Sequence, residues 1–167
     1  SFGIPVLLAL GLGSAAATLV GQSLGAGKPD AAQIYAHAAV RIGIVISGCL
    51  AVIVWIFPDA ILRAFTDKPE VIEAGRGPMR LMATFQMADT VGIILARALS
   101  GAGCTFYVMA SEILIQLFIV IPAAFFLTRY YPENLTMVWI TWALYMFAWF
   151  TAMTWKFRQG TWKDVVV

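Results

Sequence analysis

The sequence predicts an all-α membrane protein, a polytopic bundle of five transmembrane helices. Of its 167 residues, 61% are hydrophobic and only 12% are charged, and the mean hydropathy is +0.85. Soluble domains average about 45–50% apolar and about 25% charged residues, so this composition indicates a protein solvated by lipid. Most of the chain also falls into windows of about 20 mostly apolar residues, the length that crosses a hydrocarbon core.

The expected helices share this length and this apolar composition. They cover residues about 1–24, 36–57, 79–99, 106–127 and 135–155. Between the second and third windows the chain is long and polar. We expect a short helix at the membrane interface there, followed by a turn at Lys68 and Pro69. Little of the chain 1–167 remains for a soluble domain.

The sequence GAG occurs at 25–27 and again at 101–103, each time just after a window. Glycine readily adopts the left-handed conformation that ends a helix and reverses the chain, so we expect a tight turn at both places. Gly21 and Gly43 begin pairs of small residues four apart, which permit close helix packing. Pro122 lies inside the fourth window and can kink that helix.

Lys and Arg are slightly more numerous on the side that holds the first loop, the third loop and the C-terminus. Because basic residues gather on the cytoplasmic side, we expect a cytoplasmic C-terminus. Trp55, Tyr130 and Trp155 stand at window ends, as interfacial anchors do. The chain begins at Ser1 inside a window, and five helices are an odd number for a transporter built from repeats. We therefore expect a fragment of a longer protein.

Patterns of enzyme chemistry are missing from the sequence. It has no HExxH motif, no Gly-rich phosphate loop after a strand and no recognisable pair of nucleophile and base. Cys49 and Cys104 lack metal-ligand spacing and are expected to act as small apolar residues. His37, near one end of the second window, is expected to be an interfacial polar residue rather than a proton relay. We expect no enzyme activity, no cofactor and no nucleic-acid partner.

Asp89 lies near the middle of the third window. An Asp at a helix centre costs about 2.5–3.5 kcal/mol on insertion, whereas each Leu, Ile, Phe or Val returns only about 0.3–0.6 kcal/mol. Such an acid faces a bundle interior or a water-filled cavity, where it is paired, protonated or bound to a cation. We expect Asp89 to be functional and to exchange a proton, a metal cation such as sodium, and a cationic drug. The alternative is a structural Asp bonded to a neighbouring helix.

Five residues share the face of Asp89 at helical spacing: Met82, Phe85, Gln86, Gly92 and Ile93. An amide, an aromatic ring and a thioether beside a glycine suit a cavity for bulky organic cations, because aromatic faces attract cations and Met adapts to varied shapes. We predict that these residues line a substrate cavity. Arg97 and Glu112 lie at similar depth on two helices joined by the second GAG turn, and we predict that they form a structural ion pair.

Several stretches, taken together, resemble a known transporter family. They are VGQSLGAGKPDAA, FPDAILRAFTDKPEVIEAG, FQMAD, ALSGAGCT and WKFRQGTWKDVVV. They look like the second half of a NorM-like multidrug and toxic compound extrusion (MATE) transporter, from the family's eighth helix to its twelfth. The resemblance implies most of the C-terminal six-helix lobe of a twelve-helix antiporter in the plasma membrane, the inner membrane of a bacterium. The implied partners are cationic amphipathic drugs, membrane lipids and the N-terminal lobe of the same protein.

The resemblance also implies a mechanism, alternating access of two lobes driven by sodium or proton influx. The NorM-like branch carries an acid in its tenth helix as part of a cation site, and Asp89 matches it. Phe85 stands where the branch often has Tyr, and Ser100 and Cys104 stand where the family often has Arg and Asp. Two other classes remain open: another secondary transporter or flippase for lipid-linked substrates, and a non-transporting membrane subunit with a structural Asp89.

Overall fold

The computed structural model describes residues 3–130 and 135–164, and in that part of the chain every regular element is a helix. In chain order the elements are α1 (Gly3–Gly25), α2 (Pro29–Ile56), α3 (Pro58–Arg63), α4 (Pro69–Gly101), α5 (Thr105–Ile115), the π-helical turn η1 (Gln116–Val120), α6 (Ile121–Tyr130), α7 (Leu135–Gln159) and the 3-10 turn η2 (Thr161–Asp164). The predicted all-α class is confirmed.

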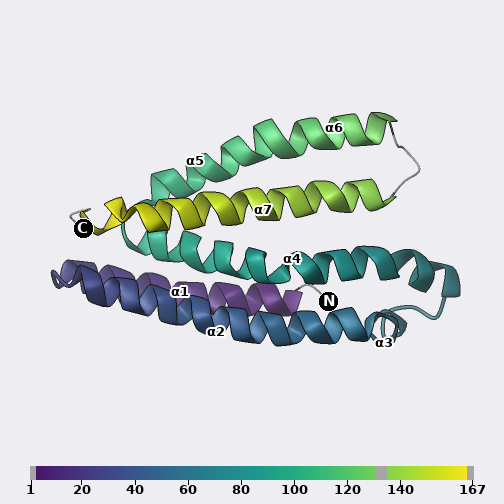
Figure 1. The fold of residues 1–167 in the computed structure, drawn as a ribbon, viewed down its shortest axis with the longest axis horizontal. Coiled ribbons are helices and arrows are strands. Elements are labelled where there is room, and N and C mark those ends of the chain that lie inside the picture. The colour runs from purple at the N-terminus through teal and green to yellow at the C-terminus, as the bar shows by residue number, and fades with distance from the viewer. Residues whose placement is uncertain (1–2, 131–134, 165–167) are drawn as a thin grey trace.

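The centre of the bundle is α4 (Figure 1). It packs against α1 and α2 on one side and against α7 on the other, and its C-terminal end contacts α5. The segment α5–η1–α6 forms one long helix beside α7. Residues on α4 therefore meet nearly every other long helix of the described chain.

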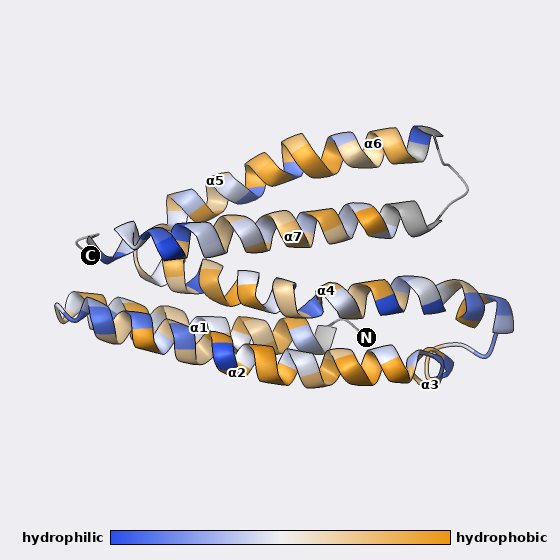
Figure 2. Ribbon diagram, in the orientation of Figure 1, coloured by the Kyte–Doolittle hydropathy of each residue, from blue (hydrophilic) through white to orange (hydrophobic). Residues whose placement is uncertain are grey.

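The outer helices α2 and α5–α6 carry long apolar stretches (Figure 2), and many of their large apolar side chains are exposed. Only 11% of the apolar window in α2 and 6% of that in α5–α6 is buried inside the protein. By contrast, α4 buries polar side chains, among them Gln86, Asp89 and Thr90. This distribution, polar groups within and apolar groups outside, is that of a helix bundle surrounded by lipid.

Three helical stretches of the described chain are long and apolar enough to cross a membrane: Pro5–Gly25, Pro29–Ile56 and Thr105–Leu127. The two other predicted spans are also helical, but α4 carries Arg80, Gln86, Asp89 and Arg97, and α7 is rich in Trp and Thr. These residues lower the hydropathy of both helices. The chain thus has several membrane-spanning helices, and a count of five stays a prediction.

The third helix starts earlier than predicted. Its expected start was residue 79, whereas α4 begins at Pro69, directly after the predicted turn at Lys68. Pro69 occupies the first helical turn, where its missing N–H is no loss. The polar stretch that follows is helical because it packs on α3, with Gly75 facing Leu62. The predicted short helix in this connection is α3, and α2 likewise starts before residue 36, at Pro29.

Both GAG sequences form the predicted turns. Gly27 and Gly103 have φ of 68° and 83°, and the amides that follow bond back to Ser23 and Leu99 at 2.8 and 2.9 Å. Pro122 disturbs its helix as expected. It has no N–H for the carbonyl of Phe118, and its ring crowds that carbonyl, so the ladder shifts by one residue into η1.

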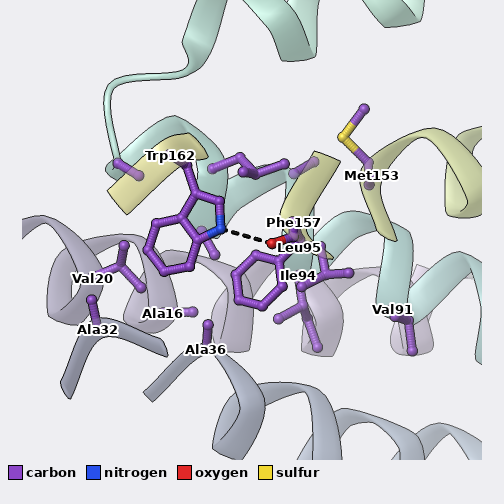
Figure 3. Close-up of a cluster of buried hydrophobic side chains, with 14 of the residues drawn as sticks. Ala16, Val20, Ala32, Ala36, Val91, Ile94, Leu95, Met153, Phe157 and Trp162 are labelled. Atoms are coloured by element: carbon purple, nitrogen blue, oxygen red, sulfur yellow. Dashed lines mark hydrogen bonds between the residues drawn. The ribbon is translucent and has the colours of Figure 1, made fainter. Parts of the chain in front are cut away.

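A core cluster of buried apolar side chains closes the end of the bundle that holds both GAG turns (Figure 3). Trp162 of η2 is 1% exposed, lies over Val20, Ala16 and Ala32, and donates its indole N–H to the carbonyl oxygen of Phe157 at 2.9 Å. The two aromatic rings stack with centroids 4.9 Å apart. The chain after α7 therefore folds back onto α1 and α2.

Small residues bring α1 and α4 into backbone contact. A Cβ added at Gly101 would overlap the backbone of Ala17, with the Cα of Ala17 at 2.6 Å, and one added at Gly21 would lie 3.0 Å from the carbonyl oxygen of Gly101. In lipid, such close packing supplies much of the free energy of helix association.

We therefore expect Gly101→Ala to lower the free energy of unfolding by about 1–3 kcal/mol, the usual cost of overpacking. Gly11→Ala is the matched control, because Gly11 also lies on α1 and a Cβ there meets nothing within 4 Å. Thermal unfolding of the two variants in detergent checks this. Equal melting temperatures would contradict the close approach.

An exposed ion pair ties α3 to α4. Both guanidinium nitrogens Nε and Nη2 of Arg76 donate to the carboxylate of Asp59 at 2.8 Å. This hydrogen-bonded guanidinium holds the pKa of Asp59 below its ordinary value of 3.8. A lowered pKa in the folded state means that the stabilisation is complete above pH 3.8 and is lost as the pH falls through the lower folded value.

We therefore expect protection of the α3 amides from hydrogen exchange, corrected for intrinsic rates, to weaken as the pH falls below 3.8. Asp59→Asn should remove this pH dependence. Asp67→Asn, in the nearby loop, should leave it unchanged. The same pH dependence in all three proteins would show that Arg76 and Asp59 do not hold α3.

Candidate functional site

A pocket of about 440 Å³ lies between α1, α4, α5 and α7. Its lining combines two carboxylates, one guanidinium and several aromatic rings. The lining residues are Val6 and Leu10 of α1, Asp89, Ile93, Ala96, Arg97 and Ser100 of α4, Val108 and Glu112 of α5, and Trp142, Tyr145 and Trp149 of α7. Four helices thus contribute to one site, with α4 giving the largest share of polar groups.

Asp89 is buried, with 8% of its surface exposed, and lies in the wall of this pocket. Within the described residues its carboxyl group has no hydrogen bond and no ion pair. The nearby hydroxyl of Thr90 donates instead to the backbone oxygen of Gln86 at 3.0 Å. The alternative of a structural Asp bonded to a neighbouring helix therefore finds no bonding partner in the described chain.

Arg97 and Glu112 line the same pocket, on α4 and α5. The ion pair predicted between them is not formed here, since the ion pairs of the described residues are Arg76–Asp59 and Lys163–Asp30. A Cβ added at Gly13 of α1 would stand 2.8 Å from Cγ of Arg97, so the stem of Arg97 packs against that helix. Pairing of the two charges across the pocket stays a prediction.

The aromatic wall of the pocket comes from α7. The Trp142 and Tyr145 rings lie 5.5 Å apart between centroids, and the Tyr145 and Trp149 rings lie 6.4 Å apart and nearly parallel, at 15°. Trp149 packs over Gly92, where an added Cβ would approach Cδ1 of Trp149 to 2.8 Å. The sequence reasoning missed this wall. Its signal was available in the spacing of three and four residues, which places all three rings on one helical face.

The residues predicted to line a substrate cavity divide into two groups. Ile93 lines the pocket, and Gly92 makes room for Trp149. Met82 and Gln86 are buried and Phe85 is partly buried, but none of the three is among the residues that line this pocket. Their contact with a substrate stays a prediction.

A sodium site at Asp89, also predicted, has no cluster of side chains to support it in the described residues. No three His, Cys, Asp or Glu side chains there lie close enough together to hold a metal ion. Asp89 and Glu112 are the acids that share the pocket, so sodium would need further oxygen ligands.

Comparison with known proteins gives consistent matches. The sequence pattern of the MatE family matches residues 2–126, a range that includes Asp89. A probable multidrug resistance protein NorM of Thermotoga maritima is 26% identical over 132 residues, 79% of this chain and 28% of the relative. A protein of the same name in Pasteurella multocida is 34% identical over 95 residues, 57% of this chain and 20% of the relative. The multidrug resistance protein MdtK of Edwardsiella ictaluri is 30% identical over 95 residues, 57% of this chain and 21% of the relative.

We expect Asp89→Asn to stabilise the protein at neutral pH in the absence of sodium and drug. Burying an unpaired carboxylate costs more than burying an amide, so the gain should be about 1 kcal/mol or more. Thermal unfolding in detergent measures it. Asp59→Asn is the control and should lower stability, because it breaks an ion pair. A loss of stability in Asp89→Asn would instead indicate that Asp89 has a structural role.

Proposed function

This chain belongs to the MatE family of membrane transporters, and from that premise we propose that it works in a multidrug efflux antiporter. The antiporter exports organic cations and other amphipathic compounds in exchange for sodium ions or protons. The chain spans only 20–28% of the length of the three relatives, so the proposal concerns the protein that carries it. The MatE family is one of transporters, not of enzymes.

One observation carries the proposal: the carboxyl group of Asp89 is buried, has no partner among the described residues, and borders a pocket with aromatic walls. Placing such a group in the interior of a bilayer costs several kcal/mol, and proteins contain such groups mainly where ions or protons bind. An organic cation beside it gains from the charge and from the ring faces of Trp142 and Trp149. A proton or a sodium ion competes for the same charge.

This competition supplies the coupling of an antiporter. When a proton or sodium ion neutralises Asp89, a bound organic cation loses its counter-charge and is released. By linkage, a bound drug weakens the affinity for the coupling ion by the same factor. In the proposed alternating-access cycle, two lobes rock around this site near the bilayer midplane, so that drug and ion meet it from opposite sides.

We also propose the membrane arrangement. The chain contributes five transmembrane helices to the C-terminal lobe of a twelve-helix transporter in the plasma membrane, the inner membrane of a bacterium. Supporting this, α1, α4 and α7 all end near the core cluster. Lys28, Lys156, Arg158 and Lys163 lie near these helix ends, and basic residues favour the cytoplasmic side. The C-terminus is therefore proposed to be cytoplasmic.

The test uses the protein that carries this chain, in proteoliposomes with sodium and proton gradients imposed separately. We expect ethidium efflux to follow one of the two gradients. Asp89→Asn should reduce that gradient-driven efflux about tenfold or more, a barrier change of about 1.4 kcal/mol or more. Asp67→Asn, which alters an exposed loop residue, is the control and should transport normally.

Two outcomes would contradict the proposal. Full gradient dependence in Asp89→Asn would assign Asp89 a structural role and move ion coupling to other residues. Export of lipid-linked molecules without any ethidium efflux would favour the flippase class.

A further inference from the structure

The aromatic side chains of α7 are of two kinds. Trp142, Tyr145 and Trp149 line the pocket, with Trp142 50% exposed and Trp149 6% exposed. Trp155 lies on the same helix, is 61% exposed and is not among the pocket residues. We call the three pocket residues Trp142, Tyr145 and Trp149 the aromatic column. Trp155, an exposed Trp of the same helix outside the pocket, provides a matched control.

The aromatic column has an ordered geometry. From Trp142 to Trp149 the helix rises about 10 Å, at about 1.5 Å per residue. Tyr145 stands between them, tilted 41° to the Trp142 ring and 15° to the Trp149 ring. Trp149 is held at its edge by Gly92 of α4, since even a Cβ there would crowd the indole. One end of the column is thus fixed by packing, and the other end is open.

The opposing walls carry the charge. Asp89 on α4 and Glu112 on α5 line the pocket together with Arg97, so the formal charge of its lining is negative when both acids are ionised. Aromatic faces and a nearby carboxylate attract a cation together, and ring faces in addition stack on flat ring systems. The pocket of about 440 Å³ is in the size range that holds drug-sized ligands, so a planar system of two or three fused rings can enter it.

We propose that the aromatic column determines substrate specificity, by selecting planar aromatic cations over cations without rings. This rests on the proposed function, because the selected substrate is the exported drug. Trp142 supplies the accessible ring face, Tyr145 continues it, and Trp149 anchors it on Gly92. Asp89 supplies the charge and the ring faces supply cation–π attraction, both of which any organic cation uses, whereas only a flat aromatic cation also stacks on the column.

The experiment compares two cations of the same charge in the protein that carries this chain: ethidium, which is planar and aromatic, and tetraethylammonium, which has no ring. We expect Trp142→Leu to reduce ethidium efflux about tenfold, because ethidium loses both a cation–π and a stacking contact, and to reduce tetraethylammonium efflux by at most about threefold, because that cation loses the cation–π contact alone. Trp142→Phe should retain most ethidium efflux. Trp155→Leu is the matched control and should change neither.

Trp142 is half exposed, so its removal spares the packing of α4 on α7, and Trp149→Phe serves as the second, milder variant. Equal loss of both cations in Trp142→Leu, or loss of ethidium efflux in Trp155→Leu as well, would overturn the proposal. So would unchanged ethidium efflux in Trp142→Leu.

A binding measurement separates this inference from the proposed function. Ethidium binding to the purified protein is followed by fluorescence, with and without Trp142. If wild type exports neither cation but binds ethidium about tenfold more tightly than Trp142→Leu does, the antiport function fails and the column stands as a binding site. If wild type binds ethidium no better than Trp142→Leu does, the inference fails whatever the transport result.

Discussion

The structure depends on keeping the polar side chains of α4 away from lipid. A helix that carries Gln86, Asp89 and Arg97 is a poor membrane span by itself, because each such group costs free energy in hydrocarbon. The bundle meets this constraint by placing α4 at its centre and the apolar α2 and α5–α6 around it. The outer helices expose many large apolar side chains, and α4 buries Gln86, Asp89 and Thr90. The need to keep these polar side chains away from lipid therefore explains both the central position of α4 and the presence of the site on it.

Small residues make that central position possible. Neighbouring helices cannot rely on the hydrophobic effect in lipid, so they need close contact and good packing. Gly21 and Gly101 let α1 and α4 touch through their backbones, and Gly43 of α2 accepts the side chain of Ile94. At Gly92 the same device acts differently, because the space it leaves is filled by Trp149 of α7. The packing is therefore tight between α1, α2 and α4, whereas the large aromatic side chains of α7 line a pocket beside α4.

Hydropathy predicts most of the helices of this fold, but it does not predict features that depend on packing between helices. The GAG turns, the short α3 and the disturbance at Pro122 were predicted from local backbone chemistry, which neighbouring helices alter little. The first part of α4 was missed because a polar segment packed on another helix looks like a loop in a hydropathy profile. Asp89 was found because an acid in an apolar window stands out.

The pocket was harder to predict, because the position of a residue along a helix gives its depth in the membrane but not which neighbouring helix its side chain faces. Arg97 and Glu112 share the pocket, as their depth suggested, and their pairing stays a prediction, while the stem of Arg97 packs on α1 at Gly13. Trp142 and Tyr145 sit in an uncharged window, where aromatic residues are easily taken for lipid-facing side chains. Only the spacing of the rings distinguishes an inner face from an outer one, and Trp155 shows that α7 has both.

The charges in the pocket favour the binding of one cation at a time. With both acids ionised, Asp89 and Glu112 oppose a single guanidinium, that of Arg97, so one monovalent cation brings the lining to neutrality. A second cation would enter a site without net attraction and would lose its hydration shell, which is costly in a medium of low dielectric. In the proposed antiport cycle, drug and coupling ion therefore exclude each other through electrostatics, even where they do not overlap in space. With Arg97 in its lining, the pocket carries one net negative formal charge rather than two, and this limit to one monovalent cation is what the proposed coupling needs.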